Sequence, residues 1–209
     1  MKFNFLPNKN LIRSECIFTL FLNAKNRKTH NHFKKAFDIY QGKSVYLSLF
    51  KTDLIFTMAI QIGDKVPELL GTDQDGKEVK MSDYQGKKVA LYFYPKDNTS
   101  GCTAEACSLR DGYQALQAKG YEIIGVSKDS AKSHQGFIKK QNLPFRLIAD
   151  TETTLQQTFG VWAEKKMCGR TYMGTLRTTF IINEEGVVTN IFGPKEVKTK
   201  EHANQILNL

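Results

Sequence analysis

The 209-residue sequence lacks several patterns that would assign it to a common class of protein. It has no C-x-x-C pair, which excludes the usual dithiol site of disulfide oxidoreductases. Its four cysteines are too few for the disulfide framework of a small secreted domain and are typical of a cytoplasmic protein. No repeat or low-complexity tract occurs. The apolar run at 16–22 is far shorter than the roughly 20 residues that cross a bilayer, so we expect no membrane partner.

The sequence also lacks a metal-binding pattern. The histidines at positions 30, 32, 134 and 202 make no ligand spacing with any cysteine. We therefore expect neither a metal nor another cofactor. His134 is expected to be an ordinary polar residue on a helix.

Positive charge is abundant but unevenly distributed. The formal net charge is +9 and the isoelectric point is about 9.3, which would suit a nucleic-acid partner. However, residues 1–57 hold 10 Lys and Arg against 3 acidic residues, whereas the remainder holds 20 against 18. Residues 58–209 are thus nearly neutral, and we expect no nucleic acid to bind there.

Residues 1–57 differ from the rest in composition. They hold 8 of the 14 phenylalanines but only 1 of the 15 glycines, and they show no sustained helical or strand period. We expect an N-terminal extension that is poorly ordered or a miscalled start, with Met58 as the biological start. The alternative is a leader or a basic targeting arm, although no small-x-small cleavage site follows the run at 16–22.

Residues 58–209 are expected to form one α/β domain. Strand, helix, strand, helix, strand and a final hairpin make a pattern typical of a thioredoxin-like fold, a mixed central sheet flanked by helices. The expected strands and hairpins are 71–80, 89–94, 121–127, 145–149, 178–182 and 187–192. The expected helices are one from 99 or 100 to 119, then 130–141, 153–159 and 199–207.

Cys102 occupies a chemically special position in this pattern. Pro95 ends an apolar strand, a turn follows, and Thr99 or Ser100 is a suitable N-cap for the next helix. Cys102 therefore lies in the first helical turn, where unpaired N–H groups and the helix dipole favour the nucleophilic thiolate. The hydroxyl of Thr99, one turn earlier, can hydrogen-bond the sulfur.

A second cysteine, Cys107, follows five positions later. On an intact helix the two α-carbons would be about 8.6 Å apart, whereas a disulfide usually needs less than about 7 Å. Spacing therefore favours a redox switch that requires the helix to unwind. Two unrelated small core residues remain the alternative.

These residues resemble the active-site loop of peroxiredoxins, whose signature of Pro, three residues, Thr or Ser, two residues and Cys is matched by Pro95, Thr99 and Cys102. A cysteine at the position of Cys107 is similar to the Q type, also called the bacterioferritin comigratory protein family. Arg177, in GTLRTTFII, matches the family's arginine motif. The resemblance covers residues 58–209 and includes the stretches 63–67, 125–129 and 143–145.

The sequence departs from the family at two positions. Ser100 stands where proline is common, and Cys168 stands where a tyrosine or a similar residue is expected. Neither change removes a catalytic group, but Cys168 adds a third thiol to the domain. We expect Cys168 to be a neutral substitution. Its presence nevertheless leaves open which cysteine is the redox partner of Cys102.

The resemblance implies a thiol peroxidase that reduces hydrogen peroxide and organic hydroperoxides. Cys102 would attack the peroxide and become a sulfenic acid, Cys107 would condense with it, and thioredoxin would reduce the disulfide. Arg177 and Thr99 would supply hydrogen-bond donors. Pro95 would shield the sulfur. The resemblance also implies a monomer.

The sequence leaves alternative roles open for two residues, Glu105 and Arg177, and it leaves two alternative functions for the protein. Glu105 matches the family's Cys-Thr-x-Glu and would orient the loop and the arginine, or it is simply an acid near a helix start. Arg177 alone could be a surface charge. A thioredoxin-type oxidoreductase is disfavoured by the missing C-x-x-C, and a redox sensor or holdase would oxidise once instead of turning over.

Overall fold

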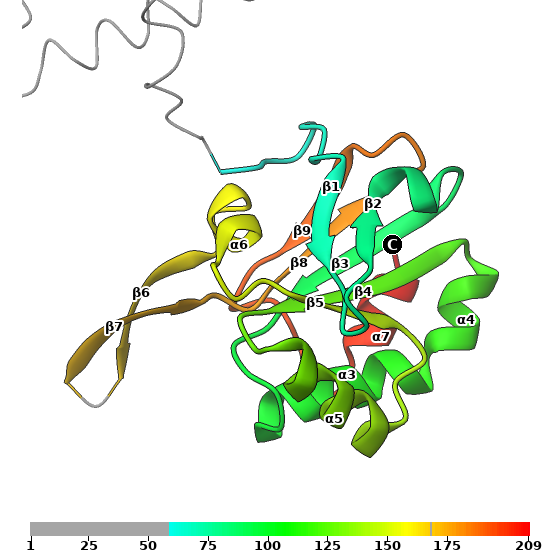
Figure 1. Cartoon of the computed structure of the whole chain (residues 1–209). Coiled ribbons are helices and arrows are strands. Elements are labelled where there is room, and N and C mark those ends of the chain that lie inside the picture. The colour runs from blue at the N-terminus through cyan, green and yellow to red at the C-terminus, as the bar shows by residue number, and fades with distance from the viewer. Residues whose placement is uncertain (1–58, 168) are drawn as a thin grey trace, which may run out of the picture. The chain divides into compact units, whose positions relative to one another are not determined.

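The structure is a computed structural model that describes residues 59–167 and 169–209 (Figure 1). The expectations for residues 1–57 and for Cys168 lie outside these residues. Among the described residues, no helix is both long and apolar enough to cross a membrane.

A mixed five-stranded sheet forms the centre of the domain. Its strands lie in the order β5–β4–β3–β8–β9. The first three are parallel to one another, and β8 runs antiparallel to both β3 and β9. This is the mixed sheet that the sequence predicts. The strands are β3 (Lys88–Phe93), β4 (Tyr121–Ser127), β5 (Arg146–Ala149), β8 (Thr178–Ile182) and β9 (Val188–Phe192).

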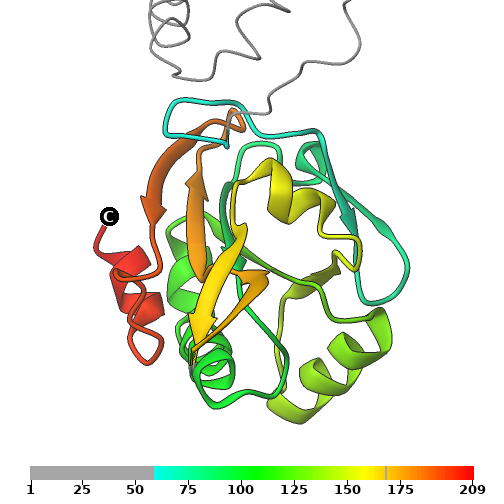
Figure 2. The same cartoon turned by 90° about the vertical axis from the view of Figure 1, so that its left-hand side faces the viewer.

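Other strands and helices cover the two faces of this sheet (Figures 1 and 2). One face is covered by a small antiparallel hairpin and a short helix, namely β1 (Leu69–Thr72), β2 (Glu78–Lys80) and α6 (Thr154–Thr158). A 3-10 helix, η1 (Met81–Tyr84), follows β2. The other face is covered by α3 (Ser100–Asp111), α4 (Tyr113–Ala118), α5 (Ala131–Gln141) and α7 (His202–Leu207).

Strand β3 explains why there are two hydrophobic cores. Side chains alternate between the faces of a strand, and residues 89–94 are all buried. Val89, Leu91 and Phe93 pack beneath β1, β2 and α6. Ala90, Tyr92 and their neighbour Tyr94 pack beneath the helices of the other face. An uninterrupted apolar run is what a strand buried on both sides requires.

The helix that begins near Cys102 is shorter than predicted. The sequence predicts one helix to position 119, but the structure breaks it at Gly112 into α3 and α4. A β-carbon at Gly112 would lie 2.5 Å from the β-carbon of Ala203 on α7. Close packing of α7 therefore needs a glycine here, and the chain bends at that residue.

One hairpin of the structure was not predicted from the sequence. Strands β6 (Trp162–Met167) and β7 (Arg170–Thr175) pair antiparallel and project from the domain (Figure 1). The outer part of β7, from Arg170 to Met173, is exposed throughout. An exposed hairpin needs neither the alternation of apolar and polar residues nor the continuous apolar run that marks a buried strand. Hydrophobic periodicity therefore gave no signal for these strands.

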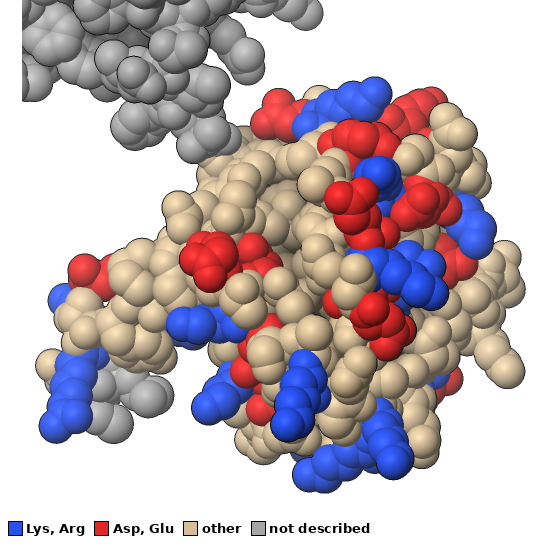
Figure 3. Space-filling model, in the orientation of Figure 1, with Lys and Arg blue, Asp and Glu red and all other residues tan. Residues whose placement is uncertain are grey.

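The surface of the described domain carries charges of both signs. In the view of Figure 3, Lys and Arg side chains are interspersed with Asp and Glu. No single-sign field covers this face, which agrees with the nearly neutral balance of residues 58–209.

His134 is not the ordinary polar residue that was expected. It is fully buried on α5, on the same helical face as Phe137. Its Nδ1 lies 2.9 Å from Asp97 Oδ2, and its Nε2 lies 3.1 Å from the carbonyl oxygen of Ile148. The expectation was wrong because a partner from a distant loop satisfies the ring inside the core.

Asp97 is the centre of a buried network that fixes the loop before α3. The Tyr94 hydroxyl donates to Asp97 Oδ1 and the Ser133 hydroxyl to Asp97 Oδ2, both at 2.7 Å. Burial disfavours the charged carboxylate, but the hydrogen bonds from His134, Ser133 and Tyr94 outweigh it and hold the pKa of Asp97 below its usual value. The loop is thereby tied to α5.

We predict that Asp97→Ala lowers the free energy of unfolding by about 3 kcal/mol, because it leaves His134 buried without its charged partner. Urea unfolding followed by circular dichroism measures this. Asp75→Ala, at an exposed hairpin position, is the control and should change stability by less than about 0.5 kcal/mol. Equal stability of both variants would contradict the proposed importance of the network.

Candidate active site

Cys102 lies just after the loop that connects strand β3 to helix α3. Strand β3 ends at Phe93, a loop follows, and Thr99 is the N-cap residue of α3. Cys102 is the third residue of this helix, and only 1% of its surface is exposed. The first backbone N–H groups of a helix have no intrahelical partner and carry the positive end of its dipole. This environment favours an anionic sulfur.

Arg177 reaches the same point from a strand far away in the sequence. Strand β8 pairs with β3 so that Thr178 lies opposite Phe93. Arg177, immediately before β8, is therefore held at the end of β3 where α3 begins. Its Nη2 lies 3.2 Å from the sulfur of Cys102. The structure thus brings a permanent positive charge into contact with the predicted nucleophile.

The other side of the Arg177 guanidinium binds Glu105. Arg177 Nη1 donates to Glu105 Oε2. Glu105 follows Cys102 by three residues, so both side chains lie on one face of α3. Glu105 is completely buried, and the plain helix acid considered from the sequence is excluded. One arginine therefore bridges two groups of a single helix.

Burial has a strong effect on the Glu105 carboxyl. Loss of solvent raises its pKa to about 7, although the charge of Arg177 and its hydrogen bond oppose the shift. Within the described chain, Glu105 Oε1 and the hydroxyl of Tyr92 are buried without a hydrogen-bond partner. Burial, and next the charge of Glu105, raise the pKa of Tyr92 well above its usual value. The sequence predicts Tyr92 only as part of the buried strand 89–94.

Thr99 and Pro95 belong to the loop that presents Cys102. The Thr99 hydroxyl donates to the carbonyl oxygen of Lys96 at 3.1 Å, and its side chain makes no capping bond. This differs from the expected hydrogen bond to the sulfur, because the hydroxyl proton already closes the turn. Pro95 directly follows the buried strand and is half-buried.

Cys107 lies on the same unbroken helix as Cys102. Both thiols are free, and Cys107 is half-buried. The Cys107 thiol donates to Gln141 Oε1 of α5 at 3.6 Å. Because α3 is continuous across both residues, their α-carbons are about 8.6 Å apart. No disulfide can form in this conformation.

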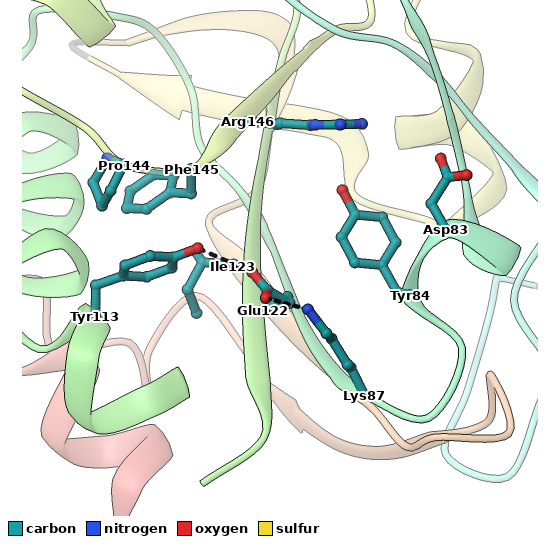
Figure 4. A pocket seen from close by; sticks show the side chains of 9 residues that line it. All are labelled: Asp83, Tyr84, Lys87, Tyr113, Glu122, Ile123, Pro144, Phe145 and Arg146. Carbon is teal, nitrogen blue, oxygen red and sulfur yellow. Dashed lines mark hydrogen bonds and ion pairs between the residues drawn. The ribbon is translucent and has the colours of Figure 1, made fainter. Parts of the chain in front are cut away.

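A separate pocket opens on another part of the domain. Its volume is about 270 Å³, and neither cysteine nor Arg177 lines it (Figure 4). Glu122 accepts from both Lys87 and Tyr113 in this pocket, so these polar groups satisfy one another. Within the described residues, no three His, Cys, Asp or Glu side chains gather as a metal site requires.

The raised pKa of Glu105 predicts a pH-dependent stability. In the native state the carboxyl holds its proton up to about pH 7, whereas in the unfolded state it loses it near its ordinary value of 4.5. The native state binds more protons between these values, so this group's contribution to stability falls as pH rises through them. Relative to that of Glu105→Gln, the free energy of unfolding of the unmodified protein should fall by up to about 3 kcal/mol as the pH rises over this range.

Urea unfolding of both proteins between pH 4.5 and pH 8 measures this difference in slope. The two curves should run parallel above about pH 7. Curves that are parallel throughout would mean that Glu105 ionises as in water. Glu68→Gln is the control, since that carboxyl lies on the exposed surface.

The chain is similar to known proteins over most of the described domain. The model of the AhpC/TSA family matches residues 62–191. Peroxiredoxin Bcp of Bacillus subtilis (strain 168) is 46% identical over 150 residues, which cover 72% of this chain and 94% of that protein. Peroxiredoxin Bcp of Escherichia coli (strain K12) is 38% identical over 149 residues, covering 71% of this chain and 94% of that protein.

A solved structure has the same fold. A cysteine-to-serine mutant of PrxQ from Xylella fastidiosa is 31% identical, with a TM-score of 0.65, and the match covers 72% of this chain and 95% of that one. The shared sheet and helices are those of the thioredoxin-like fold that the sequence predicts. The chain therefore belongs to the AhpC/TSA family, and within it to the Bcp, or Q-type, peroxiredoxins.

Proposed function

We propose that this peroxiredoxin, a thiol peroxidase, uses Cys102 as the nucleophile that reduces hydrogen peroxide and organic hydroperoxides. The observation that carries the assignment is the 3.2 Å contact between Arg177 Nη2 and the Cys102 sulfur at the start of α3. A thiolate is the reactive form of cysteine. A guanidinium and a helix start are the two groups that best stabilise it here.

In the first step the thiolate attacks one oxygen of the peroxide. A sulfur–oxygen bond forms, the O–O bond breaks, and the other oxygen leaves as hydroxide or alkoxide, which takes a proton. Arg177 and the free N–H groups of the helix start supply donors where that negative charge develops. Cys102 becomes a sulfenic acid. Thr99 holds the turn before the helix, and Pro95 limits access of water to the sulfur.

In the second step Cys107 acts as the resolving cysteine. Its sulfur attacks the sulfenic sulfur, a disulfide forms and water leaves. The two α-carbons, about 8.6 Å apart on the helix, must first approach to within about 7 Å. The start of α3 therefore has to unwind during each cycle, and the closed helix is the state that reacts with peroxide.

A thioredoxin-like dithiol protein completes the cycle by thiol–disulfide exchange. We propose thioredoxin itself as the reductant, and a monomer working in the cytoplasm as the active form. The small number of cysteines, four in 209 residues, supports a reducing compartment. Within residues 59–167 and 169–209, five large hydrophobic side chains are exposed (Ile62, Leu69, Tyr172, Met173 and Leu209), and they are scattered over several elements, which supports a monomer.

We predict that Cys102→Ser abolishes peroxide reduction, because serine supplies no thiolate. Cys107→Ser should still consume one equivalent of peroxide but stall before recycling by thioredoxin. Stopped-flow peroxide consumption and mass-spectrometric disulfide mapping after one equivalent of peroxide test both variants. Full-rate cycling of Cys107→Ser would instead implicate Cys168 or a mechanism with one cysteine.

We further predict that Arg177→Gln lowers the rate of the first oxidation by about 10²–10³-fold, the loss expected for one donor to developing negative charge. Arg177→Lys should restore only part of the rate, because an ammonium cannot contact Cys102 and Glu105 through a planar fork. Single-turnover peroxide consumption is the measurement. Arg146→Gln, at an exposed position away from both thiols, is the control. A wild-type rate for Arg177→Gln would remove the arginine from the mechanism.

A further inference from the structure

Two residues of α3 converge on the last residue of α5. Cys107 and Arg110 are three positions apart and share one helical face. The Cys107 thiol donates to the side-chain oxygen of Gln141 at 3.6 Å, and Arg110 Nη1 donates to the main-chain oxygen of Gln141 at 2.7 Å. We call Cys107, Arg110 and Gln141 the thiol latch.

The main-chain half of the thiol latch fixes Gln141 in place. Helix α5 ends at this residue, and Asn142 adopts a left-handed conformation with φ of 51°. The last carbonyls of a helix lack intrahelical partners and carry its negative end. Arg110 satisfies one of these carbonyls with a positive charge. Gln141 is thus held by Arg110 while its side chain holds Cys107.

Arg110 is itself positioned within α3. Its Nε and Nη2 both lie 2.8 Å from Asp111 Oδ1. The hydrogen bond to Asp111 is the main cause that raises the pKa of Arg110, and the neighbouring sulfur of Cys107 adds to it. The guanidinium, the sulfur and the Gln141 oxygens therefore form one cluster at the contact between α3 and α5.

We propose that Gln141 is a positioning residue that retains the Cys107 thiol on α5 and so slows closure of the disulfide. The inference rests on the proposed function, in which Cys107 resolves the sulfenic acid. The thiol latch is formed while the helix is intact, and in that state the two cysteines are too far apart to bond. The bond to Gln141 also needs the proton of the thiol, which a disulfide sulfur does not have.

A contact present in one state and absent in another shifts the equilibrium toward the first state. The thiol latch therefore favours the reduced, closed helix over the disulfide. It prolongs the life of the sulfenic acid on Cys102 after the first step. A second peroxide can convert that sulfenic acid to a sulfinic acid: a further sulfur–oxygen bond forms, the O–O bond breaks, and the other oxygen leaves as water or an alcohol. Gln141 thus sets how often the enzyme is inactivated for each turnover.

The test is Gln141→Leu in the full chain, which keeps the size of the side chain and removes the acceptor. Loss of one modest hydrogen bond should raise the equilibrium constant for disulfide formation, measured against a reference dithiol, by about three- to tenfold. Rapid quenching with a thiol-alkylating reagent after one equivalent of peroxide should show faster disulfide formation. Mass spectrometry at rising peroxide should show less sulfinic acid on Cys102.

Gln135→Leu is the matched control. It makes the same substitution on the same helix and removes a hydrogen bond from Gln135 Nε2 to the carbonyl of Gln74, without touching α3. A general loosening of α5 would alter both variants alike. The thiol latch requires that only Gln141→Leu changes the redox equilibrium and the yield of sulfinic acid.

The outcomes separate this proposal from the proposed function. If the unmodified protein forms no disulfide between Cys102 and Cys107, the assignment of the resolving cysteine fails. If it forms that disulfide and Gln141→Leu leaves its equilibrium unchanged, only the thiol latch fails. Slower disulfide formation in Gln141→Leu would also overturn the thiol latch, because Gln141 would then be guiding Cys107 toward its target.

Discussion

The guanidinium of Arg177 lies between the sulfur of Cys102 and the carboxyl of Glu105, and the chemistry of the site depends on this contact. Both partners come from α3, whereas Arg177 precedes β8. The pairing of Thr178 with Phe93 is what delivers the arginine to the start of the helix. The contact between Arg177 and the sulfur is therefore a consequence of strand register in the central sheet. A slip of one residue would turn Arg177 toward the other face.

The same helix carries two opposing requirements. In the proposed cycle, its first turn must remain formed to stabilise an anion at Cys102, yet its winding keeps Cys107 out of bonding distance. The contacts along α3 are distributed accordingly. Arg177 holds the first half, and Gln141 holds Cys107 in the second half. The N–H of Ala203 on α7 donates to the Ser108 hydroxyl at 3.2 Å. Unwinding thus has to overcome contacts with three separate elements.

Sequence patterns predicted the elements that pack against the sheet, because burial imposes a period on them. They failed where a distant contact decides the structure. The helix breaks at Gly112 because α7 packs closely against that residue, and His134 is buried because Asp97 contacts it from a distant loop. The contact of Arg177 with Cys102 spans 75 positions and was expected only from a family motif. Gln141 had no signal at all, since its role depends on where two helices meet.

In the proposed cycle, oxidation of Cys102 changes the strength of the contacts that hold α3. The thiolate of Cys102 attracts Arg177 by charge, whereas a protonated sulfenic acid carries none, so the first step weakens the contact that holds the first turn. Glu105 keeps the arginine in place while this happens. The contact between Cys107 and Gln141 is unaffected by the charge on Cys102, because it involves the other sulfur. We therefore propose that, once peroxide has reacted, the contact between Cys107 and Gln141 is a restraint that still opposes the disulfide at full strength, so that a single amide shifts the balance between recycling and inactivation.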